Sequence, residues 1–78
     1  MKITDAIDML QEMLEDNTVP KNVRARLEKT IIVLQEKEEH KIKISRALHE
    51  IEEISSDTNM QADTRTQLFN VASMLEII

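Results

Sequence analysis

The sequence predicts an all-α protein, a four-helix up-and-down bundle made of two similar antiparallel helical hairpins. Strong helix formers dominate its 78 residues, and glycine, which most tight β-hairpins use at the turn, does not occur. Apolar residues recur at helical spacing in four stretches, and no stretch alternates as a half-buried strand would. A chain of this length makes one domain, residues 1–78, with hairpin one at about 4–36 and hairpin two at about 39–78.

Local signals place the ends of the helices in the first hairpin. Thr4 can cap the first helix, which we expect to end near Asp16–Asn17. Pro20 fits the first position of the second helix, because the N–H that proline lacks has no partner there. The stripes that these two helices would bury are Ile3, Ile7, Leu10, Met13 and Leu14, then Val23, Leu27, Thr30, Ile31 and Leu34.

The second hairpin follows the same plan. We expect the third helix to end near Ser55–Ser56, because residues 56–59 are turn and cap formers, and the fourth to begin at about Gln61. The stripes are Ile44, Ala47, Leu48, Ile51 and Ile54, then Thr64, Leu68, Val71, Ala72, Leu75 and Ile78.

The boundary between the hairpins has no Gly or Pro to mark it. We favour a break near Glu36–Glu39. The alternative is one continuous helix from Pro20 to Ser55, roughly 54 Å long at 1.5 Å per residue. Such a helix would force a swapped or intertwined dimer, because 78 residues cannot cover both of its ends.

An internal repeat at an offset of 41 residues pairs the two hairpins. Its most pointed polar feature is an Asp followed eight residues later by an Arg, at Asp16 and Arg24 and again at Asp57 and Arg65. We expect each carboxylate to cap or brace its turn and to form an ion pair with an Arg of the same or the opposite repeat. The alternative is a binding site for an anion or a partner on the two arginines.

Two segments resemble a known family. Glu15–Arg24, with the sequence EDNTVPKNVR, and Ile54–Thr66, with the sequence ISSDTNMQADTRT, are similar to the matching segments of uncharacterised protein family number 0147, a group of small archaeal proteins. Members tend to carry Pro where this chain has Thr58 and Gln61. The resemblance implies a four-helix fold with no assigned activity, and it adds no catalytic residue.

Composition excludes several kinds of chemistry. Without Cys there is no thiolate metal site or Cys nucleophile, and without Gly there is no phosphate-binding loop of the usual kinds. His40 and His49 each lie four residues from a glutamate, but a metal site needs three or four converging ligands. We therefore expect no enzyme activity, no cofactor, no metal site and no small-molecule substrate.

Charge is unevenly distributed. Residues 21–46, the basic block, hold eight bases and four acids, a net charge of +4 in a chain whose net charge is −5. One interpretation is an RNA- or ribosome-associated accessory protein that binds through this block. The other is internal pairing, in which the basic second and third helices lie beside the acidic first and fourth, and Glu39–Lys43 and Arg46–Glu50 also pair at i,i+4. Overall acidity disfavours general binding to nucleic acid.

Some apolar residues fall outside the main stripes. Phe69 and Ile77 share one side of the fourth helix, and Met74 is also surplus to a simple interior. These residues indicate either a homodimer interface or a wide core face. The same two interpretations apply to Met9, Ile32 and Ile42, which are also surplus to a simple interior. We expect a structural or protein-interaction module that binds itself or another protein. Asp5 and Asp8 interrupt the first apolar run and no membrane span is evident, so we expect a cytoplasmic protein.

Overall fold

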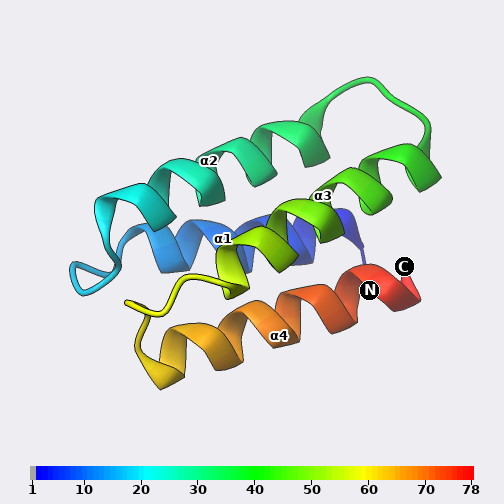
Figure 1. Cartoon of the computed structure of the whole chain (residues 1–78). Helices are drawn as coiled ribbons and strands as arrows, with labels where there is room; N and C mark the ends of the chain where they lie inside the picture. The colour runs from blue at the N-terminus through cyan, green and yellow to red at the C-terminus, as the bar shows by residue number, and fades with distance from the viewer. Residues whose placement is uncertain (1) are drawn as a thin grey trace.

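The computed structural model describes residues 2–78, so Met1 lies outside the described residues. Four α-helices follow one another along this part of the chain, α1 (Ile3–Leu14), α2 (Lys21–Gln35), α3 (His40–Ser55) and α4 (Ala62–Ile77), and it contains no strand (Figure 1). The predicted all-α class is therefore confirmed. None of these helices combines the length and hydrophobicity that crossing a bilayer requires.

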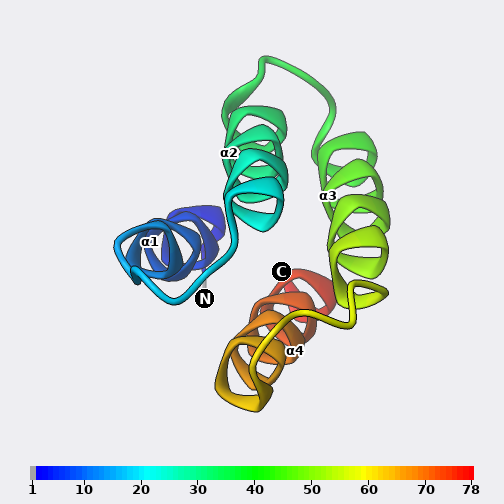
Figure 2. The ribbon, with the colours of Figure 1, turned by 60° about the vertical axis from the view of Figure 1, so that its left-hand side comes forward.

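The helices pack as a closed ring. α1 packs against α2 and α4, and α3 packs against the same two helices from the other side. Figure 2 looks more nearly along the helices and shows the four of them arranged around a common centre. The bundle measures 32 × 20 × 20 Å. The chain thus forms a four-helix bundle of two antiparallel hairpins, as the sequence predicted.

The interior is apolar and draws on every helix. Burial of one leucine side chain contributes about 1.5–3 kcal/mol to the free energy of folding. The core is therefore the main source of stability. Its largest fully buried apolar side chains are Leu10, Met13, Val23, Leu27, Leu34, Ile54, Leu68, Val71 and Leu75.

The helix boundaries in the first hairpin differ from the predicted ones by a few residues. α1 starts at Ile3, and the carboxylate of Asp5 accepts a 2.9 Å bond from the Lys2 N–H, so the predicted Thr4 cap is wrong. α1 ends at Leu14, before the predicted Asp16, because the Asp16 side chain bonds locally to the backbone and competes with the helix. Pro20 is the N-cap of α2, one residue outside the predicted position, and its ψ of 152° is extended.

The break between the hairpins lies at residues 36–39. α2 ends at Gln35, Glu36 has an extended ψ of 154°, and α3 begins at His40. Nη1 of Arg46 donates to Oε2 of Glu36 at 2.8 Å, so the first residue of the connection is tied to α3. The chain therefore folds back at this point, and α3 packs against α2 rather than continuing it.

Candidate functional site

The turn between α3 and α4 is crossed by Arg65. Nη1 of Arg65 donates to the carbonyl oxygen of Ser55 at 2.6 Å, and Nη2 donates to the carbonyl oxygen of Asp57 at 2.9 Å. Both acceptors are main-chain carbonyls at the end of α3, where helical carbonyls lack partners within the helix. One side chain from the first turn of α4 thus holds the end of the preceding helix.

The equivalent turn between α1 and α2 is held by fewer bonds. Nη2 of Arg24 donates to the carbonyl oxygen of Asp16 at 2.9 Å. Nε of Arg24 is buried and has no hydrogen-bond partner among the described residues. The repeated arginine therefore reaches the same carbonyl position in both hairpins, but Arg65 makes one bond more.

The two aspartates accept hydrogen bonds from uncharged groups, both within their own turn and, for Asp57, from α2. Oδ1 of Asp16 accepts from the N–H and the hydroxyl of Thr18, at 2.9 and 2.7 Å. Oδ1 of Asp57 accepts from the Asn59 N–H at 2.9 Å, and its Oδ2 accepts from Nδ2 of Asn22 at 2.7 Å. Hydrogen bonds from Thr18 lower the pKa of Asp16, and those from Asn59 and Asn22 lower the pKa of Asp57, because each stabilises the ionised carboxyl.

The predicted ion pairs need a correction. In residues 2–78 neither Asp16 nor Asp57 has a carboxylate oxygen within 4.0 Å of a guanidinium nitrogen of Arg24 or Arg65. Each carboxylate already binds backbone N–H groups inside its own turn, so the arginine takes the carbonyl of the same residue instead. That these contacts stabilise the turns stays a prediction.

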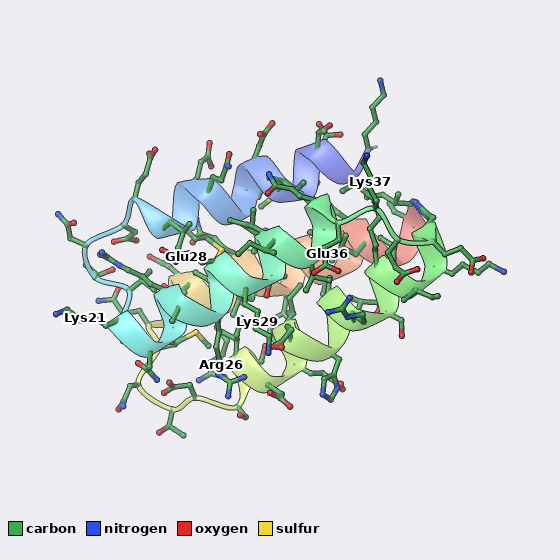
Figure 3. The ribbon with its side chains drawn as sticks, turned by 90° about the horizontal axis from the view of Figure 1, so that it is seen from above. Lys21, Arg26, Glu28, Lys29, Glu36 and Lys37 are labelled. Carbon is green, nitrogen blue, oxygen red and sulfur yellow. The ribbon has the colours of Figure 1, made fainter. Side chains whose placement is uncertain are left out.

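Three of the eight bases of the basic block form ion pairs that join α2, or the residue after it, to α3. Arg26 lies 2.7 Å from Oε2 of Glu53, and Lys29 lies 2.9 Å from Oε1 of Glu50. Arg26 is also 3.8 Å from Oε2 of Glu50, which is buried. Figure 3 shows Arg26 and Lys29 extending from α2 toward α3, whereas Lys21 and Lys37 point away from the bundle. Within residues 2–78 no ion pair joins the basic block to α1 or α4, so the three paired bases take their acids from α3 and from the α2/α3 connection, not from the acidic first and fourth helices.

The predicted pairs within α3 are not formed. Arg46 binds Glu36 and Glu50 binds Lys29, so both take partners across the helix contact instead of each other, and the described residues show no Glu39–Lys43 pair. Hydrogen bonding to Arg26, followed by the charge of a protonated His49, lowers the pKa of Glu53. His49 lies 3.1 Å from Oε1 of Glu53.

A polar groove of about 450 Å³ lies along this α2/α3 contact. The charged side chains in it already have ion-pair partners, either in the groove or at its edge. Within residues 2–78 no cluster of three His, Asp or Glu side chains is arranged to hold a metal ion. The groove is lined by Lys29, Val33, Ser45, Arg46, His49 and Glu50.

An apolar groove lies between α3 and α4, and Phe69 forms part of its wall. Phe69 is 60% exposed although it is the largest apolar side chain on α4. The part of the groove beside Phe69 has a volume of about 310 Å³, and it continues toward the start of α3 as a second part of about 320 Å³. Leu48 and Glu76 line both parts, so we treat them as one α3/α4 groove. The first part is lined by Leu48, Ile51, Glu52, Ser55, Phe69, Ala72 and Glu76, and the second by His40, Lys41, Ile44, Ser45, Leu48, Leu75, Glu76 and Ile78.

The structure separates the three predicted interface residues. Phe69 lines the α3/α4 groove, but Ile77, which is 73% exposed, lines neither part of it. Met74 is partly buried and packs against the core, as does Met9, so the wide-core interpretation holds for these two. Ile32 and Ile42 are 58% and 41% exposed, so these two surplus residues lie outside the core.

Sequence reasoning missed the contribution of α3 to this groove. Ile44 and Leu48 were assigned to the core stripe of the third helix, and both are only partly buried. The available signal was the width of that stripe, which is broader than one interior face needs. Asn22, which joins α2 to the second turn, was also missed, because nothing in the sequence links positions 22 and 57.

Several known proteins are similar to this chain, two of them in sequence and one in structure. A UPF0147 protein of Methanocaldococcus jannaschii is 46% identical over 69 residues, covering 87% of this chain and 74% of its own. A UPF0147 protein of Sulfurisphaera tokodaii is 40% identical over 78 residues, covering 99% of this chain and 88% of its own. The crystal structure of MMP1188, a protein of unknown function, matches with a TM-score of 0.93 at 35% identity, over 97% of this chain and 88% of that one.

The match extends over the whole sequence. The model of the family described as "Uncharacterised protein family (UPF0147)" matches residues 1–78. This agrees with the resemblance of Glu15–Arg24 and Ile54–Thr66, which is thereby confirmed. The family description names no function and no enzyme activity. On these grounds the chain belongs to uncharacterised protein family UPF0147.

Proposed function

We propose that this protein is a non-enzymatic protein-interaction module that acts as a homodimer joined through the α3/α4 groove. The observation that carries the proposal is Phe69, which is 60% exposed and lines an apolar groove. An aromatic side chain buries about 150–250 Å² when it is covered, so leaving it in water forgoes a large hydrophobic gain. A partner that covers the groove would recover that gain.

The size of the molecule makes a second copy a suitable partner. A stable interface removes about 800 Å² of accessible surface from each partner. The accessible surface of the chain is 5017 Å², so such an interface would take about a sixth of it. Small chains also gain stability from association, because the partner binds only the folded state.

The α2/α3 side supports the non-enzymatic part of the proposal. Lys29, Arg46 and His49 line its polar groove, and each has a carboxylate partner. General acid–base or nucleophilic work needs a group that is free to meet a substrate, with a neighbour to activate it. Lys29 instead joins α2 to α3, and Arg46 joins Glu36, the residue after α2, to α3. His49 joins one turn of α3 to the next.

The RNA- or ribosome-binding alternative has less support. Binding to nucleic acid draws most of its affinity from lysines and arginines that neutralise phosphates. Arg26, Lys29 and Arg46 of the basic block are engaged with glutamates, and Arg24 donates to a carbonyl of the first turn. Phosphate binding at these side chains would have to break their bonds first, which leaves four lysines of the block without an ion pair within residues 2–78, namely Lys21, Lys37, Lys41 and Lys43.

Light scattering at micromolar concentration tests the proposal. Concentration is measured by refractive index, because the chain has no Trp or Tyr. We expect a mass of about 18 kDa, twice the 9.1 kDa of the chain, for the unmodified protein and about 9 kDa for Phe69→Glu. Ile32→Glu is the matched control, because Ile32 is 58% exposed and lies on α2, and it should remain a dimer.

Circular dichroism of each variant checks that the helices are retained. An unmodified protein that stays at 9.1 kDa overturns the homodimer. If both the unmodified protein and a folded Phe69→Glu variant are dimeric, the dimer uses another surface.

A further inference from the structure

We propose that the two copies pack antiparallel, with Lys41 of each copy facing Glu52 of the other and Phe69 seated in the Ile44 end of the opposite α3/α4 groove. This inference rests on the homodimer proposed above and deepens it, because it specifies how the second copy is recognised. In such a symmetric interface, if residue i of one copy contacts residue j of the other, then j of the first contacts i of the second.

The charge order of α3 provides the first argument. The first half of the helix carries His40, Lys41, Lys43 and Arg46, and the second half carries Glu50, Glu52 and Glu53. This order is opposite to the one that the helix dipole favours, which has acids first and bases last. Another interaction must therefore offset it.

Contacts inside the chain account for only part of this order. Arg46, Glu50 and Glu53 all pair with α2 or its following residue. Lys41 and Glu52 instead line the α3/α4 groove, and neither takes part in an ion pair within residues 2–78. Along α3, the reversed order thus leaves Lys41 and Glu52 at opposite ends of the proposed interface, while Glu76 of α4 lines both parts of the groove between them.

The spacing of these two residues suits an antiparallel partner. They are eleven positions apart, about three helical turns, so they project from the same side of α3 roughly 16 Å from one another. A two-fold axis midway between them, near Ser45 and Leu48, brings each Lys41 to the Glu52 of the other copy. A parallel arrangement would place like charges together, which is repulsive.

The same axis brings Phe69 to a place that can accept it. Phe69 lies at the end of the groove that contains Ser55, whereas the opposite end contains Ile44, Leu75 and Ile78. Antiparallel packing superimposes these two ends. That opposite end has a volume of about 320 Å³ and is partly apolar, so each copy presents both an aromatic side chain and a recess for one.

Charge reversal tests the arrangement. Lys41→Glu or Glu52→Lys alone replaces attraction by repulsion at two symmetric positions, so we expect the dissociation constant of the dimer to rise about tenfold. The double variant restores opposite charges and should return the dissociation constant to within about twofold of the original. Salt should diminish both effects.

The matched control reverses charges elsewhere. Lys37 and Glu28, both exposed, lie at the α2/α3 connection and on α2, so Lys37→Glu, Glu28→Lys and their combination change net charge equally without touching the groove (Figure 3). These variants should dimerise as the unmodified protein does.

The outcomes separate the two proposals. A dimer that Phe69→Glu disrupts, but that responds equally to reversals at position 41 and at position 37, overturns the antiparallel arrangement and leaves the homodimer standing. Failure of the double variant to recover from the loss in the single variants also overturns the arrangement. An unmodified protein that is monomeric throughout overturns both proposals.

Discussion

The turns of the two hairpins differ although they are built from the same repeated residues. In the first, Arg24 makes one bond to a carbonyl and Thr18 supplies both donors to Asp16. In the second, Arg65 makes two such bonds, and Asp57 is also held by an amide from α2. The first turn is therefore bonded only within its own hairpin, whereas the second is also bonded to α2 of the other hairpin.

This difference shows what a sequence repeat does and does not determine. Identical residues at an offset of 41 produce the same bond from arginine to the Asp carbonyl at 2.9 Å. The bond from Asn22 depends on a residue that differs between the repeats, since Asn22 corresponds to Asp63, whose carboxylate cannot donate. The second bond of Arg65 goes to a main-chain carbonyl, which Leu14 also has at the position of Ser55, so side-chain identity does not explain it. Equivalent positions therefore share a fold but differ in their hydrogen bonds.

The largest expected effect comes from the core, where the hairpins should behave alike. Leu27 and Leu68 are equivalent in the repeat and both are fully buried. Leu27→Ala and Leu68→Ala should each lower the free energy of unfolding by about 2–5 kcal/mol, because each leaves a cavity. Urea unfolding at one fixed protein concentration measures both. Values that differ by several kcal/mol would show that the hairpins are unequal in their cores as well.

The arginines should give a smaller and unequal effect. Arg65→Ala removes two charge-assisted bonds and should cost about 2 kcal/mol, or roughly 10 °C in Tm. Arg24→Ala should cost about 1 kcal/mol, because it removes one bond and also a buried Nε without a partner. Thermal unfolding followed by circular dichroism measures both. A decrease in Tm below one degree for Arg65→Ala would rule out its role in bracing the turn.

The smallest effect concerns the two carboxylates and acid stability. The pKa values of Asp16 and Asp57 both lie below the ordinary 3.8, so their contribution to stability is complete above that value and is lost as pH falls through the lowered pKa. Thr18→Val should raise the pKa of Asp16 alone, and Asn22→Ala that of Asp57 alone. Titration of the carboxyl carbons by nuclear magnetic resonance measures each residue, and a change at both sites in either variant would contradict their independence.

Helix positions and the break at residues 36–39 could be predicted because periodicity and composition are local properties. The ends of α1 and the role of Pro20 were misplaced by one or two residues, since side-chain bonds such as Asp16 to Thr18 compete closely with helical ones. Phe69 could be identified as surplus, but the groove that it lines could not. That groove depends on how α3 and α4 are rotated against each other, which is a property of the packed bundle.

The closed ring of helices would allow the two hairpins to be joined in the opposite order. Because the four helices alternate in direction, α1 begins at the same end of the bundle at which α4 ends, and the two helices are in contact (Figure 1). A short peptide between these two helix ends, with the backbone opened at residues 36–39, would give a circular permutant in which hairpin two precedes hairpin one. All four helix contacts would be kept, and α2 and α3 would meet without a covalent link. The difference in unfolding free energy between permutant and parent would then isolate what that one connection contributes, apart from the ion pairs beside it.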